Sequence, residues 1–329
     1  MAFYERYLKS LPRLRKAGYV FAGKRKHSAV KVCLWARRSL CGRGSCYKQR
    51  FYGIQSHRCL QMTPAMPSCN QRCAFCWRDT RLFSREWPLD GADEPGEIID
   101  ECIRGQQLLL TGFKGNALVD PGKWAEAQDP NQAAISLDGE PTMYPKLAGL
   151  VKEFHGRGFT TFLVTNGTRP EALRLLAREN ALPTQLYVSL CAPDGETYEK
   201  TCLPVNPGSW EKLDETLELL PWLETRKVLR LTLVKGLNLH SPEAYAKLVK
   251  KSGVDYVECK SYMHVGFSTE RLTQEHMPSH GEIRAFAAEL AEHSGYEFTD
   301  EQEESRVVLL SRDAAAASKR LIRQTRRAR

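Results

Sequence analysis

The chain has 329 residues, of which 42% are hydrophobic and 26% are charged. It contains no run of about 18 apolar residues, which argues against a transmembrane helix. The first 16 residues, MAFYERYLKSLPRLRK, are too charged for a signal peptide. We therefore expect a cytoplasmic protein with no membrane partner.

The net charge of +9 is concentrated at the two ends of the chain. Residues 1–50 contain 14 lysines and arginines and one acid, and residues 312–329 contain seven and one. The segment between them carries a net charge of −10. Basic ends around an acidic body favour a polyanionic partner, RNA or DNA, over a merely solubilising surface.

The predicted elements alternate between strand and helix after residue 67. Residues 1–68 are predicted to be irregular, apart from a short amphipathic helix at 3–16. Strands are predicted at 133–137, 160–165, 185–190, 228–234, 254–258 and 307–310, with one more just before or within the region 69–76. Helices are predicted at 145–155, from 170, and at 209–220, 241–251 and 279–292. This alternation indicates βαβ units and a parallel sheet.

The fold class is therefore predicted to be α/β, a partial or full (β/α) barrel over residues 66–311. An irregular basic extension, residues 1–65, precedes the barrel, and a basic tail, residues 312–329, follows it. An open doubly wound sheet would show a glycine-rich dinucleotide loop, which this sequence lacks. Barrels of this kind place their chemistry at the C-terminal ends of the strands.

Seven of the eleven cysteines fall within residues 33–76, and in a reducing compartment such clustering indicates a metal site. Cys69, Cys73 and Cys76 form a CxxxCxxC motif. Three thiolates on one loop suit a [4Fe–4S] cluster with one iron left open. The motif resembles that of radical S-adenosylmethionine (SAM) enzymes, in which SAM binds the open iron and yields a 5′-deoxyadenosyl radical. Zinc is the alternative, with His57 or Cys59 as the fourth ligand.

Further positions resemble the SAM-binding parts of these enzymes. Phe75 precedes the third cysteine, where many radical SAM enzymes place an aromatic ring beside the adenine. Residues 137–142, LDGEPT, resemble the second signature of the superfamily, with an aspartate in place of its first glycine. We expect this turn to bind the amino group of SAM. The SAM-binding residues predicted on this basis are Phe75, Gly139, Glu140 and Pro141, with Asn166 and Ser189 as further candidates that are equally compatible with turn formation.

A second cysteine set, Cys33, Cys46 and Cys59, has a spacing of thirteen residues, repeated once. It suits a second [4Fe–4S] cluster, and zinc with Cys41 or His57 as a further ligand is the alternative. The remaining cysteines, Cys102, Cys191, Cys202 and Cys259, are predicted to be small core or barrel-lining residues.

The two sets together resemble one family, the tRNA 4-demethylwyosine synthases. The resemblance covers roughly residues 25–290. It includes CYKQRFYGI at 46–54, HRC at 57–59, CAFCWR at 73–78, LTLVKG at 231–236 and YMHVG at 262–266. Cys191 departs from the family pattern, because the resemblance implies an acidic residue at this position.

The resemblance implies a carbon–carbon lyase of wybutosine-type tRNA modification. Such an enzyme condenses N1-methylguanosine-37 of tRNA(Phe) with two carbons of pyruvate to form 4-demethylwyosine, using SAM and two [4Fe–4S] clusters. A carbon radical on the N1-methyl group adds to pyruvate, whose C1 is lost before ring closure. The eukaryotic members' flavodoxin-like domain has no counterpart in this sequence, so an external electron donor of flavodoxin or ferredoxin type is expected, as is a monomer.

Lys48 is the candidate catalytic residue, because a lysine amine can form a Schiff base with a ketone and Lys48 follows Cys46 by two residues. Its alternative role is a phosphate contact. Aromatic residues interleave with cations in this stretch, as expected for stacking on loop bases of RNA. Two other functions remain open on the sequence: a radical SAM enzyme acting on another RNA or a peptide, and a zinc-dependent RNA-binding protein without catalysis.

Overall fold

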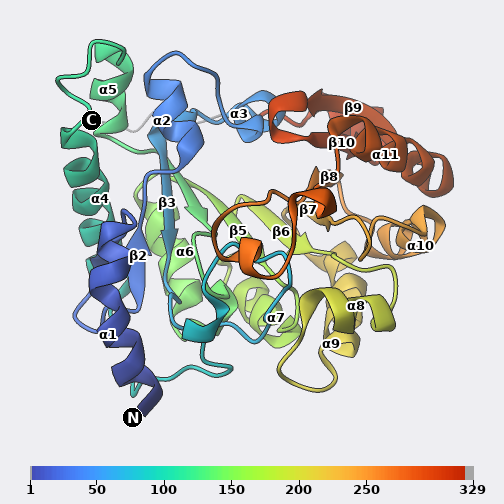
Figure 1. The fold of residues 1–329 in the computed structure, drawn as a ribbon, viewed down its shortest axis with the longest axis horizontal. Helices are drawn as coiled ribbons and strands as arrows, with labels where there is room; N and C mark the ends of the chain where they lie inside the picture. The colour runs from blue at the N-terminus through green and yellow to red at the C-terminus, as the bar shows by residue number, and fades with distance from the viewer. Residues whose placement is uncertain (1, 323–329) are drawn as a thin grey trace.

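The structure, a computed structural model, describes residues 2–322 and is built on one sheet. In that part of the chain the sheet has ten strands in the order β1-β2-β3-β4-β5-β6-β7-β8-β10-β9. The strands are β1 (Val20–Ala22), β2 (Ser28–Val30), β3 (Cys59–Thr63), β4 (Gln132–Ile135), β5 (Thr160–Thr165), β6 (Gln185–Ser189), β7 (Arg226–Leu233), β8 (Tyr256–Ser261), β9 (Glu297–Gln302) and β10 (Val307–Ser311) (Figure 1).

Twelve α-helices of the described residues surround this sheet. They are α1 (Ala2–Lys16), α2 (Leu34–Leu40), α3 (Tyr47–Tyr52), α4 (Pro95–Thr111), α5 (Pro121–Ala127), α6 (Leu147–Gly156), α7 (Pro170–Arg178), α8 (Gly195–Cys202), α9 (Ser209–Leu219), α10 (Pro242–Ser252), α11 (His280–Ser294) and α12 (Ala314–Ser318). None of the helices in residues 2–322 is long and apolar enough to cross a membrane.

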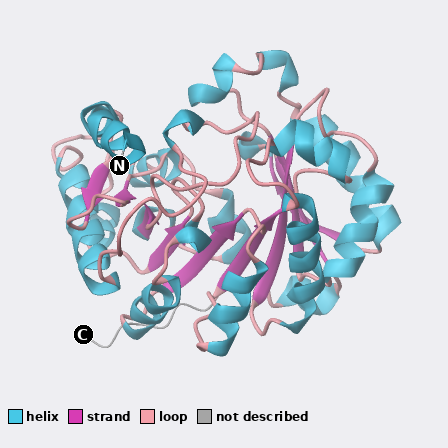
Figure 2. Cartoon of the chain, turned by 90° about the horizontal axis from the view of Figure 1, so that it is seen from below, coloured by secondary structure: helices cyan, strands magenta, loops and turns pink. Residues whose placement is uncertain are grey.

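Strands β3 to β8 are parallel, while β1 and β2 at one end and β10 and β9 at the other are antiparallel. Within residues 2–322 the two ends of the sheet do not pair with each other, so the barrel is open. The sheet curves into an arc with helices on its outer side and loops within it (Figure 2). This is the predicted partial (β/α) barrel.

Side chains alternate between the two faces of each strand, as the period of a strand requires. On β6, Leu186 and Val188 pack outward in the large core under the helices. Tyr187 faces the barrel interior, where it joins Phe162 and Tyr256 in a separate aromatic cluster. The interior therefore has an aromatic base with polar side chains nearer the C-terminal ends of the strands.

The predicted strands and helices after residue 130 agree with the structure, with boundaries shifted by a few residues. Strand β8 shifts most, since it begins at Tyr256 where residue 254 was predicted. Strand β9 and helices α4, α5 and α8 were not predicted. Residues 2–63 are more regular than the sequence indicated, because they form α1 to α3 and contribute β1 to β3 to the same sheet as the barrel.

Part of the predicted basic tail packs against the N-terminal end of the barrel. Ala316 and Ile322 join the interior aromatic cluster, and Tyr256 donates a 2.9 Å hydrogen bond to the Ala316 carbonyl oxygen. Arg226 donates a 2.7 Å bond to the Lys319 carbonyl oxygen. Residues 323–329 of the predicted tail lie outside the described residues.

Candidate active site

The first cysteine set, Cys69, Cys73 and Cys76, lies on the loop that follows the C-terminal end of β3. Backbone hydrogen bonds fix this loop, from Cys69 N to the Ser84 oxygen and from Ala74 N to the Thr201 oxygen, both 2.9 Å. The three thiols are free and half-buried, whereas the four cysteines predicted to be structural are fully buried. Cluster ligands must face a space that can hold the cluster, so the partial exposure of these three thiols is consistent with a role as ligands.

Burial and mutual repulsion disfavour thiolates in the first set. Burial, followed by the charge of Cys73, raises the pKa of Cys76 to about 12 and that of Cys69 well above its usual value. The Arg72 guanidinium lies within electrostatic reach of all three thiols. A metal must therefore displace protons here, and Arg72 supplies part of the compensating positive charge.

The turn at residues 138–142 follows β4 and packs tightly against the loop between β3 and Cys69. Gly139 has φ +66°, and a Cβ there would lie 1.9 Å from the Ala65 carbonyl oxygen. The neighbouring Glu140 N donates a 2.6 Å hydrogen bond to the Ser68 oxygen. Glycine is therefore required on two grounds, the left-handed backbone and the close approach.

Glu140 ties this turn to the end of β5. Its Oε1 accepts hydrogen bonds from Thr142 N and Oγ1 and from Thr165 Oγ1, at 2.6–3.0 Å. Its Oε2 accepts one bond, 2.7 Å, from Asn166 N. These four hydrogen bonds use the roughly four lone-pair positions of the carboxylate, so the Glu140 side chain serves to fix the turn against β5.

The side chains of the other predicted SAM-binding residues are held by contacts within the protein. The Asn166 amide donates to Asn70 Oδ1 at 2.8 Å and accepts from Thr168, so its side chain is held within the protein. Phe75 is half-buried and packs against two core clusters. Ser189 is the half-buried last residue of β6, and Pro141 begins a buried 3₁₀ turn.

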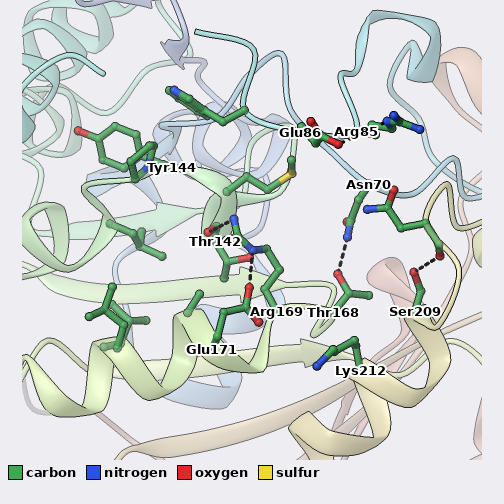
Figure 3. Close-up of a pocket in the computed structure, with 18 of the residues that line it drawn as sticks. Asn70, Arg85, Glu86, Thr142, Tyr144, Thr168, Arg169, Glu171, Ser209 and Lys212 are labelled. Atoms are coloured by element: carbon green, nitrogen blue, oxygen red, sulfur yellow. Dashed lines mark hydrogen bonds and ion pairs between the residues drawn. The ribbon is translucent and has the colours of Figure 1, made fainter. Parts of the chain in front are cut away.

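A cavity lies beside these residues, outside both cysteine sets. It has a volume of about 830 Å³ and is lined by Asn70, Thr142 and Thr168 together with the first turns of α6, α7 and α9 (Figure 3). Its three cations, Arg85, Arg169 and Lys212, each pair with a glutamate. No cysteine lines it, so we place the chemistry in the barrel interior.

The second cysteine set, Cys33, Cys46 and Cys59, gathers at the opposite end of β3. Cys33 and Cys46 immediately precede α2 and α3, and Cys59 is the first residue of β3. Burial raises the pKa of Cys46 to about 11, and the Cys33 charge adds to this shift. The structure thus brings the three predicted thiols together, and β3, about 13 Å long, separates them from the first set.

The donors around the second set fit a cubane better than a closed zinc ion. His57, the proposed zinc ligand, already bonds Glu126 through Nε2 at 2.5 Å and Ser39 through Nδ1 at 3.5 Å. In residues 2–322 no three His, Cys, Asp or Glu side chains converge closely enough to hold one metal ion. In a cubane each thiolate binds a different iron, so the sulfurs need not meet at one point.

Lys48 links the second cysteine set to the barrel interior. Its positive charge acts on the pKa of all three thiols. Its Nζ lies 4.4 Å from the centroid of Tyr187 and 5.1 Å from that of Phe162, and within residues 2–322 it donates no hydrogen bond. Burial, followed by the nearby Arg230 charge, lowers the pKa of Lys48 to about 8. The amine is therefore unoccupied, and a larger fraction of it is neutral than in water.

Charged side chains from β7 and β8 line this interior, and none of them was among the predicted site residues. Glu258 is fully buried and accepts hydrogen bonds from Tyr47 and Tyr52 of α3 and from Arg230 of β7, at 2.8–3.0 Å. Lys260, on β8, donates to the Ser305 oxygen. The arginine inside the otherwise apolar strand KVLRLTLV could have indicated this site in the sequence, since a buried strand carries a charged side chain only where an oppositely charged or polar group pairs with it.

The predicted structural cysteines are confirmed as buried, and one of them lies beside the first set. Hydrogen bonding between the thiols of Cys191 and Cys202 lowers the pKa of Cys191, and Cys202 also bonds Cys73. Cys191, where an acid was expected, thus belongs to a chain of thiols that leads to the first set, and it also lies within electrostatic reach of Arg230.

Comparison with known proteins agrees with this arrangement. The Radical SAM superfamily model matches residues 63–249, and the model described as Wyosine base formation matches residues 251–312. A tRNA 4-demethylwyosine synthase of Pyrococcus abyssi is 53% identical over 91% of this chain and 87% of its own length. The enzyme of that name from Methanocaldococcus jannaschii is 39% identical over 91% and 94%.

A solved structure described as TYW1 with a lysine-pyruvate adduct bound is also similar to this chain. It has a TM-score of 0.82 and 38% identity, and the match covers 92% of this chain and 95% of that one. The crystal structure of an archaeal TYW1 has a TM-score of 0.75 at 34% identity. With its two thiol sets at the ends of β3 and this degree of identity along nearly its whole length, the chain belongs to the radical SAM superfamily and, within it, to the tRNA 4-demethylwyosine synthase family.

Proposed function

We propose that the protein condenses N1-methylguanosine of tRNA with pyruvate to form 4-demethylwyosine, as a radical SAM enzyme. The observation that carries this proposal is the position of Lys48 between the second cysteine set and the barrel interior, where its amine has no hydrogen-bond acceptor in the described part of the chain. A related protein of 38% identity holds a lysine-pyruvate adduct. We infer that Lys48 is the lysine that takes up pyruvate here.

Two groups of residues would hold the cofactors. Cys69, Cys73 and Cys76 would hold one [4Fe–4S] cluster, and the backbone of the turn at residues 138–142 would position SAM beside it. Cys33, Cys46 and Cys59 would hold a second [4Fe–4S] cluster. The first cluster and SAM supply the radical that removes hydrogen from the N1-methyl group.

The step assigned to Lys48 is imine formation. Its neutral Nζ attacks C2 of pyruvate, a C–N bond forms, and the keto oxygen leaves as water. The rings of Phe162 and Tyr187 flank the amine and limit access of solvent to the imine. As an imine with pyruvate, Lys48 presents the methyl carbon of pyruvate to the barrel interior, where the substrate base must enter.

The partner that we propose is tRNA(Phe) carrying N1-methylguanosine at position 37. Helix α1 packs beside the first cysteine loop through a cluster that includes Tyr7, Met66 and Leu137. Its exposed lysines, Lys9 and Lys16, have no ion-pair partner among residues 2–322 and lie at this rim of the barrel. Phosphate contacts of this kind position an RNA while a loop base is splayed out. We further propose a cytoplasmic monomer that takes electrons from an external flavodoxin or ferredoxin.

The test combines product analysis with trapping. Anaerobically purified protein with reductant, SAM, pyruvate and N1-methylguanosine tRNA should yield the tricyclic base by mass spectrometry. Cyanoborohydride with labelled pyruvate should label Lys48. Lys48→Met keeps the aliphatic stem over the rings, and Lys48→Arg keeps the charge, but neither forms an imine.

Both variants should retain iron and lose the label and the product. SAM cleavage without any tricyclic base would assign the chain to another radical SAM reaction. A colourless protein that contains zinc would refute the catalytic proposal altogether, and wild-type product from Lys48→Met would remove Lys48 from the mechanism.

A further inference from the structure

Arg230 occupies the barrel interior with part of its guanidinium unused. It lies on the inner face of β7, where its register partners are Ser189 of β6 and Glu258 of β8. Its Nε donates to Glu258 Oε2 at 3.0 Å, while its buried Nη2 has no hydrogen-bond partner in the described residues. A buried donor without an acceptor is costly, so proteins rarely keep one unless something else binds it.

Glu258 Oε2, the carboxylate oxygen that Arg230 contacts, already accepts two hydrogen bonds. The other oxygen, Oε1, accepts from Tyr52, and Oε2 accepts from both Tyr47 and Arg230. Lys260, the other interior cation of β8, donates to the Ser305 backbone oxygen at 2.7 Å. Among the described residues Arg230 is therefore an interior cation near Lys48 whose buried Nη2 is free to donate.

Arg230 also lies within reach of the reactive amine. Its Cζ is 4.6 Å from the centroid of the Tyr187 ring, and Lys48 Nζ is 4.4 Å from the same centroid. The two cationic groups are thus no farther apart than the sum of these distances. In an imine the carboxylate of pyruvate lies about 3 Å from the lysine nitrogen, and a charge-assisted hydrogen bond to guanidinium adds about 2.8 Å. Together these two lengths are shorter than that upper bound, so a single carboxylate can reach both groups when they lie on the same side of the ring.

We propose that Arg230 binds the carboxylate of the 2-oxo acid that Lys48 takes up, a proposal that rests on the function proposed above. Nη2 donates to a carboxylate oxygen while Nε remains on Glu258. The carboxylate is unchanged when the C2–N bond forms and water leaves. Arg230 thereby selects 2-oxo acids over neutral ketones and fixes which side of the imine presents the methyl carbon.

The experiment measures how the Lys48 adduct depends on ketone concentration. Holoenzyme is incubated with pyruvate or with acetone, which has the ketone but no carboxylate, and the imine is trapped with cyanoborohydride and quantified by peptide mass. In Arg230→Met the half-saturating pyruvate concentration should rise roughly 10- to 100-fold, the size of one charge-assisted hydrogen bond, with acetone labelling unchanged. Arg230→Lys should restore part of the affinity and serves if the methionine variant fails to fold.

Lys260→Met is the matched control, because it removes a neighbouring interior charge whose donor is already used. It should change the pyruvate dependence by less than about threefold. An equal loss in Lys260→Met and Arg230→Met would refute a specific contact, as would an unchanged pyruvate curve in Arg230→Met and Arg230→Lys. A wild-type holoenzyme without any Lys48 adduct would instead refute the proposed function itself.

Discussion

Gly139→Ala tests whether the turn at residues 138–142 is as tightly packed as the structure indicates. The new Cβ would lie 1.9 Å from the Ala65 oxygen and 2.7 Å from the Ser68 oxygen, both backbone atoms of the loop before Cys69. The control is Gly236→Ala, since Gly236 has a similar φ of +74° but nothing within 4 Å of its added Cβ. The two variants share the backbone strain, and only Gly139→Ala adds a collision.

The strain alone should cost about 1–2 kcal/mol in the free energy of unfolding, because an L-residue is forced into the left-handed region. Gly139→Ala must also displace the Ser68 oxygen and weaken its 2.6 Å hydrogen bond from Glu140 N, worth about another 1 kcal/mol. We expect Gly236→Ala to lower the Tm by about 1.5–3 °C, and Gly139→Ala by about 1.5 to 2 times as much.

Thermal unfolding of the anaerobic holoenzyme, measured beside SAM binding and SAM cleavage, checks this prediction. Gly139→Ala should lose more than about tenfold in SAM affinity, because movement of the turn displaces the backbone that would position SAM. Gly236→Ala should bind and cleave SAM as the wild type does. Equal Tm shifts together with normal SAM cleavage in both variants would refute the reasoning.

The remaining predictions concern the second cluster and the RNA-binding surface. Replacing all three cysteines of the second set, Cys33, Cys46 and Cys59, by alanine should halve the iron and sulfide content from about eight irons per chain. The control variant Cys41→Ala should leave the iron content unchanged. Full iron content in the triple variant would argue against a second cluster. Lys9→Ala with Lys16→Ala should weaken tRNA binding and reduce the slope of log K against log[salt] by about 1–2, since each lysine neutralises one phosphate. The exposed lysines of α10, on the far side from α1 (Figure 1), provide the control, and the double variant Lys247→Ala/Lys250→Ala should bind tRNA normally.

Local patterns in the sequence were sufficient to predict most of the barrel. Strand β5 has the predicted bounds, and β6, β7 and β10 differ from prediction by one or two residues, because an apolar run followed by a turn is a local signal. Residues 2–63 were harder to interpret, since β1 and β2 have three residues each and the isolated segments lack a readable period. Their strand conformation depends on the pairing of β1 with β2 and of β2 with β3, which only the folded sheet provides.

In the candidate site, too, some features follow from the sequence and others only from the tertiary structure. The spacing of the thiols and the glycine in LDGEPT are short-range features, so the sequence by itself determined which residues are candidates for holding clusters and SAM. It did not determine that Lys48, Arg230 and Glu258, from α3, β7 and β8, meet inside one barrel. This meeting depends on the register that aligns Arg230 with Glu258 and on the packing of α3 against the base of the barrel. These contacts join residues up to 211 positions apart, and their stability comes from burial in the folded interior, which no local pattern records.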